Sequence, residues 1–383
     1  MRNRSNLFNS DLGIAIISFL MYLFRIFPIN SQKVVFTSFY GKYADNPLAI
    51  SKKLRELSSD IDIVWLLKDR TDLKSEGIRS VPYHSIRAIY ELATAKVWVD
   101  SHRKPLWVKK RNSQYYIQTW HGGIAMKKIE GGVDGWPINK IKKSMMDSKM
   151  ADLFISGCEW RTKNYRDCFW YDGEVLKSGQ PKADVFYRDF RKLKEQIKKE
   201  LRVPVSSRII LYAPTFRDDY RTDDYSIDVN RVISSLRHRV PMDWVFLVRL
   251  HPILTYRNID LDSKVINVSD YSDMNKLIIA CDVLISDYSS CIFDAYLAKK
   301  VVFLFAPDMD RYQEERGFNF KFEDLPSPVA ISNQELSNNI LFFDYAKYSN
   351  AREEFIKKLG YYGNGNASNE VSKIIINKLD IEK

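Results

Sequence analysis

The sequence predicts an α/β protein of two doubly wound domains, each a parallel sheet with helices on both faces, that face each other across a cleft. Three observations lead to this prediction. The chain has 383 residues, which at roughly 150 residues per domain corresponds to two domains. Short apolar runs alternate with helical patterns, as in parallel sheets. The alternation is interrupted by a charged amphipathic stretch near residues 186–205 and then starts again.

The composition is that of an ordinary globular protein with an excess of positive charge. Hydrophobic residues make up 45% of the chain and charged residues 28%, which excludes global disorder and fibrous repeats. The net charge of +11 favours anionic partners, namely a phosphate-rich substrate, an acidic membrane surface or nucleic acid. The four cysteines form no CxxC pair, so we interpret them as free, buried thiols in a reducing compartment.

The first 30 residues are expected to associate with a membrane. Residues 12–24 form an uninterrupted apolar run of 13 residues, which is short of the roughly 20 that a spanning helix needs. Basic residues lie on both sides of the run and no signal-peptide cleavage site follows it. We therefore expect a helix that lies in the membrane interface. A helix buried in the protein, or a true span in which Arg25 snorkels to the interface, are the alternatives.

Predicted strands and helices define the domains along the rest of the chain. The first domain covers residues 31–187 and the second covers 188–360, with a C-terminal helix or tail at 361–383. Apolar runs predict strands in the first domain at residues 34–38, 62–67, 96–100, 115–120, 152–156 and 174–179. The same pattern predicts strands in the second domain at residues 208–213, 243–250, 264–268, 282–286 and 301–306.

Ligands of doubly wound sheets bind at the carboxyl ends of the strands, and polar residues gather there in this sequence. His121 follows a predicted strand of the first domain, and His251 follows one of the second. The other three histidines, His84, His102 and His238, have no such setting, so we interpret them as ordinary surface or structural residues.

The His121-Gly122-Gly123 sequence has two open interpretations. Two glycines allow a tight turn and the close approach of a ligand, and a histidine at such a turn can act as a general base near neutral pH. The alternative is a histidine that is merely hydrogen-bonded within a turn.

The second domain offers polar groups that could hold phosphates. Ser289 and Ser290 open a predicted helix, where hydroxyls and backbone amides form either an anion site or a plain N-cap. Thr215 and Arg217 can bind phosphate oxygens, although Arg217 and Asp218 can equally pair with each other on the surface.

Other charged segments give weaker signals. Residues 310–317 carry Arg316 just before a glycine, and a solvated charge run is the alternative there. The acidic pairs at 218–219 and 223–224 are interpreted as surface loops, so the sequence predicts neither a metal site nor a cofactor other than the substrate itself.

Taken together, these residues resemble the CDP-glycerol glycerophosphotransferase family, whose members prime and polymerise teichoic acids and some capsular polymers. The resemblance covers roughly residues 32–345. It is carried by six motifs in order, namely QTWHGG at 118–123, SGQPKADVF at 178–186, ILYAPTFRD at 210–218, VRLHP at 248–252, DVLISDYSSCIFDAYL at 282–297 and ERGFNF at 315–320. It implies a GT-B-like fold, as in glycosyltransferases, with a membrane-associated N-terminus.

The resemblance also implies roles for individual residues. His121 matches the proposed base that deprotonates the acceptor hydroxyl, and His251 matches a histidine proposed to contact the donor phosphates. Arg316 matches an arginine proposed to bind the pyrophosphate. The other implied donor-binding residues are Thr215, Arg217, Asp218, Ser286, Asp287, Ser289, Ser290 and Asp294.

The sequence departs from the family pattern beside His121. Gly123, Ile124 and Ala125 stand where many members have Thr-Pro-Leu, and Gln180 and Lys182 also differ from the usual residues. The departure at 123–125 lies on the expected acceptor side, with Gly122, Gly123 and Lys127. It therefore bears on the identity of the acceptor more than on the type of reaction.

The expected reaction follows from the resemblance and the charge. His121 would deprotonate a hydroxyl of a lipid-linked saccharide or polymer, the oxygen would attack the β-phosphorus of CDP-glycerol or CDP-ribitol, and CMP would leave. Eleven Lys or Arg against three acids between residues 103 and 149 favour contact with an anionic membrane or acceptor. Trp107 and Trp136 lie in the same region, and a solvated basic face is the alternative.

The expected location is the cytoplasmic face of the bacterial cell membrane. Two other functions stay open: a GT-B glycosyltransferase that uses a nucleotide sugar, and a non-catalytic membrane-peripheral assembly protein. Binding to nucleic acid has no supporting motif. Glycerol or ribitol, and one added unit or many, are also open choices.

Overall fold

The computed structural model describes residues 10–69, 72–215, 217, 227–250 and 265–379. Contacts divide the chain into two compact units. Unit 1 consists of Met1–Gly123, Glu130–Asp184 and Tyr362–Lys383, and unit 2 consists of Ile124–Ile129 and Val185–Tyr361. The chain therefore enters unit 2 twice, first for a segment directly after the predicted HGG turn.

Unit 1 is a seven-stranded parallel sheet with helices on both faces. The strand order is β3-β2-β1-β4-β5-β6-β7. The strands are β1 (Asn30–Thr37), β2 (Asp62–Leu67), β3 (Arg79–Pro82), β4 (Ala95–Asp100), β5 (Tyr115–Gln118), β6 (Leu153–Ile155) and β7 (Glu174–Leu176). The helices are α2 (Asp11–Leu23), α3 (Asp45–Leu57), α4 (Ile86–Thr94), α5 (Ile138–Met150), α6 (Glu159–Phe169) and α14 (Ala367–Lys378).

Unit 2 repeats the plan with six parallel strands. The order is β10-β9-β8-β11-β12-β13. The strands are β8 (Arg208–Tyr212), β9 (Trp244–Val248), β10 (Val265–Asn267), β11 (Val283–Ser286), β12 (Val301–Phe305) and β13 (Val329–Ala330). The helices are α7 (Arg191–Glu200), α8 (Val229–Arg239), α9 (Met274–Ala280), α10 (Cys291–Leu297), α11 (Met309–Arg316), α12 (Asn333–Leu341) and α13 (Tyr345–Lys358).

The strand orders locate the expected ligand crevices. In unit 1 the order reverses between β1 and β4, and in unit 2 it reverses between β8 and β11. Such switch points open a crevice at the carboxyl ends of the strands. The α/β class and the parallel sheets agree with the prediction. The short strands β3 and β13 were not predicted, because four and two residues carry too little of an apolar pattern.

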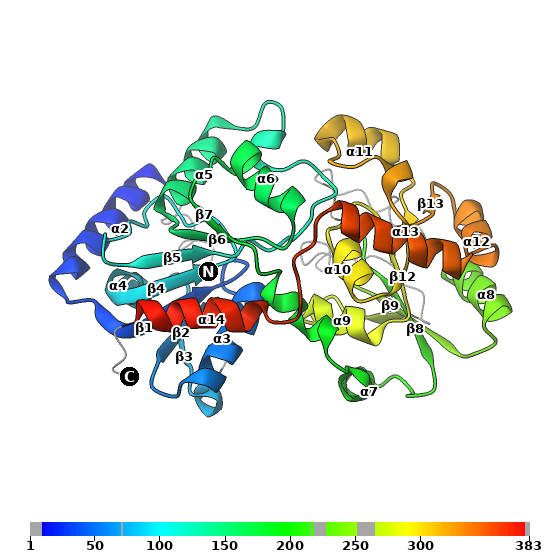
Figure 1. The fold of residues 1–383 in the computed structure, drawn as a ribbon, viewed down its shortest axis with the longest axis horizontal. Coiled ribbons are helices and arrows are strands. Elements are labelled where there is room, and N and C mark those ends of the chain that lie inside the picture. The colour runs from blue at the N-terminus through cyan, green and yellow to red at the C-terminus, as the bar shows by residue number, and fades with distance from the viewer. Residues whose placement is uncertain (1–9, 70–71, 216, 218–226, 251–264, 380–383) are drawn as a thin grey trace. The chain divides into compact units, whose positions relative to one another are not determined.

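The C-terminal helix belongs to the structure of unit 1. Helix α14, red in Figure 1, lies beside α3. Its Val371 and Ile375 are buried in the same core as Trp65 of β2. Asp184 caps this helix, because its carboxylate accepts hydrogen bonds from the backbone N–H of Ala367 at 3.0 Å and of Ser368 at 2.7 Å.

The apolar N-terminal run forms α2, a helix of 13 residues. Ile17 and Met21 are buried in a core of unit 1, whereas Leu12 and Phe19 are 72% and 62% exposed. Within the part of the chain that is described, no helix is both long and apolar enough to cross a membrane.

Candidate active site

His121 lies just beyond the end of β5, at the edge of the sheet where the polar residues were predicted to gather. Trp120 before it adopts a left-handed backbone conformation, with φ of 50°, which turns the chain away from the strand direction. The half-buried His121 ring places Nδ1 3.1 Å from the carbonyl oxygen of Ser101. A carbonyl can only accept a hydrogen bond, so Nδ1 carries the proton of the neutral ring. Nε2 is therefore the atom that can accept a proton from a substrate.

A second histidine stacks on the first. The ring centroids of His102 and His121 are 4.3 Å apart with an interplanar angle of 16°. Burial lowers the pKa of His102 to about 4. Burial also lowers the pKa of His121 well below its usual value, and the neighbouring His102 adds to this shift. Both rings are therefore neutral near pH 7, as a general base must be.

The interpretation of His102 as an ordinary residue was incomplete. It lies two residues beyond β4, and its backbone N–H donates to Asp100 Oδ1 at 2.9 Å. Because β4 and β5 are neighbouring parallel strands, residues that follow them meet at one edge of the sheet. The sequence signal was present, since His102 closely follows a predicted strand, as His121 does.

Three side chains hold the turn that carries His121. Lys182 Nζ donates to the carbonyl of His121 at 3.0 Å, and Arg161 Nε donates to the carbonyl of Gly123 at 3.1 Å. Asn46 Nδ2 donates to the carbonyl of Trp120 at 2.8 Å. These bonds fix the backbone on both sides of the histidine, so the ring is presented in one position.

The departures from the family pattern meet in the structure. A Cβ at Gly123 would lie 3.0 Å from Cγ of Gln180, closer than most Cβ contacts. Gln180 in turn accepts a hydrogen bond from Asn46 Nδ2 at 2.7 Å. The glycine and the glutamine are therefore parts of one packing arrangement, and a threonine at position 123 would press on this glutamine.

Part of the predicted basic surface is buried. Arg103 pairs with Asp147 at 3.2 Å, and Lys104 pairs with Asp100 at 2.9 Å. These two cations lie under the site and compensate buried carboxylates. The exposed positive charge of this region is therefore smaller than the sequence count indicates.

In unit 2, Arg217 is the centre of a buried ion network. Its Nε and Nη2 donate to the carboxylate of Asp308 at 2.9 and 2.8 Å, and Nη1 donates to Asp287. The side chains of Arg217 and Asp287 are 4% and 1% exposed. Two buried carboxylates therefore balance the charge of Arg217, whose side chain is itself buried.

Asp287 and Ser286 connect neighbouring strand ends. Asp287 accepts a hydrogen bond from the backbone N–H of Thr215 at 2.9 Å, which joins the end of β11 to the end of β8. Ser286 Oγ donates to the carbonyl of Ala213 at 2.6 Å. Both side chains therefore hold the segments that follow β8 and β11 in place relative to each other.

The other predicted donor-side residues lie around the start of α10. Ser289 and Ser290 are half-buried and directly precede the helix, and Asp294 lies in its first turn. His251 and Asp218 lie outside the described residues. The backbone of Arg316 ends α11, and nothing is described of its side chain.

The segment that follows the HGG turn packs within unit 2. Lys127 and Phe318 form an antiparallel bridge. Asn319 Nδ2 donates to the carbonyls of Ala125 and Lys127 at 2.9 and 2.8 Å. Lys127, predicted on the acceptor side with Gly122 and Gly123, is therefore held by the ERGFNF motif. Asn319 is a site-forming residue that the residue-level prediction missed.

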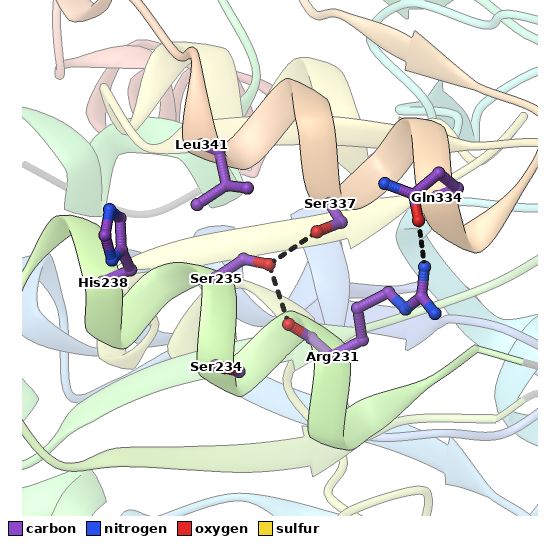
Figure 2. A pocket seen from close by; sticks show the side chains of 7 residues that line it. All are labelled: Arg231, Ser234, Ser235, His238, Gln334, Ser337 and Leu341. Atoms are coloured by element: carbon purple, nitrogen blue, oxygen red, sulfur yellow. Dashed lines mark hydrogen bonds between the residues drawn. The ribbon is translucent and has the colours of Figure 1, made fainter.

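A separate hollow of about 580 Å³ lies between α8 and α12 of unit 2. In Figure 2, Ser235 and Ser337 face each other, with their Oγ atoms 2.8 Å apart, and Arg231 donates to Gln334. None of the catalytic, donor-binding or acceptor-side residues predicted from the sequence lines this hollow. Across the described residues, no group of three or more His, Cys, Asp or Glu side chains is arranged to hold a metal ion.

Two parallel sheets with polar residues at the switch points define a ligand-binding, doubly wound α/β protein with a candidate base in unit 1. A family model described as CDP-glycerol:poly(glycerophosphate) glycerophosphotransferase matches residues 19–377. The chain belongs to this family.

Individual relatives agree with the family. The chain is 30% identical to the teichoic acid glycerol-phosphate transferase of Staphylococcus aureus over 90% of this chain and 93% of that protein. It is 31% identical to the teichoic acid poly(glycerol phosphate) polymerase of Bacillus subtilis, over 80% of this chain but only 43% of that longer protein. Relatives named for ribitol phosphate also match.

A solved structure of the wall teichoic acid polymerase TagF, soaked with CDPG, has the same fold. The TM-score is 0.82 at 26% sequence identity, and the match covers 98% of this chain and 97% of that one.

Proposed function

We propose that this chain transfers glycerol phosphate, or the related ribitol phosphate, from a CDP-alditol to a hydroxyl of a membrane-linked acceptor and releases CMP, in teichoic acid or capsular polymer synthesis. Family membership and relatives named for glycerol-phosphate and ribitol-phosphate transfer support the reaction class. The observation that carries the chemistry is the tautomer of His121, whose Nδ1 donates to Ser101 and leaves Nε2 to accept a proton.

The reaction begins with the acceptor hydroxyl. His121 Nε2 takes its proton, and the oxygen forms a bond to the β-phosphorus of the donor. The bond between that phosphorus and the bridging oxygen breaks, and CMP leaves with the oxygen and its electron pair. The proton on Nε2 then passes to solvent. The hydrogen bond to the Ser101 carbonyl stabilises the doubly protonated ring meanwhile.

The donor is proposed to bind to unit 2. Thr215, Ser289 and Ser290 follow β8 and β11, on the two sides of the switch point. The resemblance adds His251 and Arg316, for which no side-chain geometry is described. Arg217 and Asp287 are proposed to shape this site rather than to neutralise phosphate, because they are engaged with each other.

The exposed face of α2 is proposed to lie against the cytoplasmic face of the bacterial membrane. Leu12 and Phe19 of α2 are 72% and 62% exposed, and Ile26, just after the helix, is 80% exposed. Such an exposed apolar face favours the membrane interface. An acceptor anchored in the same membrane would then be concentrated near the site.

The test measures CMP release by the purified chain with CDP-glycerol, CDP-ribitol and a panel of nucleotide sugars, each with and without a short-chain lipid-pyrophosphate disaccharide. We expect acceptor-dependent CMP release from one CDP-alditol. His121→Asn retains an amide donor for Ser101 but lacks a basic nitrogen, so turnover should fall on the order of 10²–10⁴-fold. His121→Ala should be impaired similarly, and the exposed His238→Asn serves as control.

Three results would contradict the proposal. Release of a nucleoside diphosphate from a sugar donor would indicate a glycosyltransferase. Wild-type turnover in His121→Asn would exclude His121 as the base. No release from any donor by the folded protein would favour a non-catalytic assembly protein.

A further inference from the structure

The turn after β1 presents an exposed aromatic ring beside the two histidines. Phe39 and Tyr40 both adopt left-handed backbone conformations, with φ of 42° and 56°, and Gly41 follows with φ of 105°. Such a conformation costs a residue with a side chain on the order of 1 kcal/mol or more. Two consecutive strained residues persist only where the surrounding structure holds them.

Backbone hydrogen bonds hold this turn. The N–H groups of Gly41 and Lys42 donate to the carbonyl of Ser38 at 2.8 and 2.7 Å, and the carbonyl of Gly41 accepts from the N–H of Lys68 at 2.8 Å. A Cβ at position 41 would lie 2.6 Å from the nitrogen of Lys68. The glycine is thus required, and the turn carries the Tyr40 ring in a fixed place.

The two aromatic rings of the turn differ in their surroundings. The half-buried Phe39 ring packs against His121 and His102, at centroid distances of 5.4 and 5.0 Å. Tyr40 contacts His102 edge-on at 4.7 Å but is 53% exposed. Phe39 therefore supports the histidine stack, whereas about half of the surface of Tyr40 is accessible to a ligand.

A cation lies over the Tyr40 ring. Lys143 of α5 places its Nζ 5.9 Å from the centroid of the Tyr40 ring. Burial lowers the pKa of Lys143, and in the described part of the chain no carboxylate lies within ion-pair distance of its ammonium. A partly desolvated ammonium with no paired carboxylate gains from an anionic ligand group.

We propose that Tyr40 and Lys143 form an acceptor subsite that binds a pyranose ring carrying a phosphate, with the ring stacked on Tyr40 and the phosphate at Lys143. A flat aromatic face binds the apolar face of a sugar ring, and an acyclic alditol chain offers no such face. Tyr40 contacts His102, and His102 stacks on His121, so the subsite is separated from the base by a single ring. The acceptor is accordingly a saccharide phosphate rather than a poly(alditol phosphate) chain.

The proposal rests on the proposed function only where it calls the ligand of this subsite the acceptor. Binding of the ligand is therefore measured in the absence of a donor. The probes are an N-acetylhexosamine disaccharide with a short alkyl pyrophosphate, the same disaccharide without pyrophosphate, a short oligo(glycerol phosphate), and CDP-glycerol. Kd is determined for each probe by titration calorimetry, and saturation-transfer NMR identifies the protons that touch the protein.

The variants distinguish the contribution of the Tyr40 ring from that of the strained backbone and from that of the Lys143 charge. Tyr40→Asn removes the ring but suits a left-handed backbone, so it should fold at least as well as the wild type. Tyr40→Phe keeps the ring. Lys143→Met keeps the apolar stem without the charge. Tyr345→Asn removes a tyrosine that is 56% exposed in unit 2 and is the matched control.

We expect Tyr40→Asn to raise the Kd of both disaccharide probes about tenfold, which corresponds to the loss of about 1.4 kcal/mol of binding free energy. Tyr40→Phe and Tyr345→Asn should bind as the wild type does. Lys143→Met should weaken only the pyrophosphate form. Unchanged disaccharide binding in Tyr40→Asn would overturn the proposal, and so would a selective loss of CDP-glycerol or oligo(glycerol phosphate) binding. Absence of CMP release with intact disaccharide binding would instead count against the proposed reaction alone.

Discussion

Replacing His102 with phenylalanine should reduce the sensitivity of the protein to acid. Phenylalanine keeps a flat ring in the stack on His121, and the backbone bonds of residue 102 to Asp100 and Gln118 do not involve its side chain. His102 Nδ1 has no hydrogen-bond partner, so the substitution loses no bond at that atom. The main change is the removal of a group that titrates.

The magnitude follows from the pKa of His102. Burial lowers this pKa from 6.5 to about 4. Because one pKa unit corresponds to about 1.4 kcal/mol, the largest decrease in the free energy of unfolding that this group can cause is about 3 kcal/mol. Between these two values the unfolded chain binds more protons than the native one, so acid favours unfolding. The stability is fully present above pH 6.5 and is lost as the pH falls toward 4. At pH 5 the loss from this group is about 2 kcal/mol.

The assay is urea unfolding at pH 8 and pH 5 for the wild type, His102→Phe and the exposed control His238→Phe. The difference in unfolding free energy between the two pH values should be about 2 kcal/mol smaller in His102→Phe than in the other two proteins. Acid-sensitive groups that His102 does not touch contribute equally to all three proteins and cancel in the comparison.

The reasoning would be refuted by an identical loss of stability at pH 5 in His102→Phe and the wild type. A secondary effect is expected at the base, because His102 helps to lower the pKa of His121. Lys182 and Arg161, which also lower it, remain in the variant, so any acid limb of the activity profile should move only slightly upward.

Three further predictions concern other parts of the chain. Arg217→Met leaves the carboxylates of Asp287 and Asp308 buried without their cation, so the unfolding free energy should fall by about 3–5 kcal/mol in urea titrations; a loss below 1 kcal/mol would show that the network is dispensable. Gly41→Ala combines φ of 105° with a Cβ 2.6 Å from a backbone nitrogen, so calorimetry should show a lower Tm, whereas an unchanged Tm would mean that the turn adjusts freely. Phe19→Glu should reduce sedimentation with anionic vesicles several-fold at unchanged Tm, and equal sedimentation would argue against membrane contact through α2.

The sequence alone determined the class of fold and the edge of each sheet where the site lies. Apolar runs of strand length alternating with helical patterns require parallel sheets covered on both faces. Their carboxyl ends then bring together residues such as His121, Thr215 and Ser289. The motif spacing indicated the family, which the comparisons confirm.

Only the tertiary structure decided which partner each of these residues has. His102 and His121 stack because β4 and β5 are adjacent, and Arg217 meets Asp287 and Asp308 from 70 and 91 residues away. Helix α14 likewise joins unit 1 through Asp184, 183 residues before the amide it caps. Strand and helix patterns are local properties of the chain, whereas contacts, burial and pKa shifts depend on which distant segments pack together.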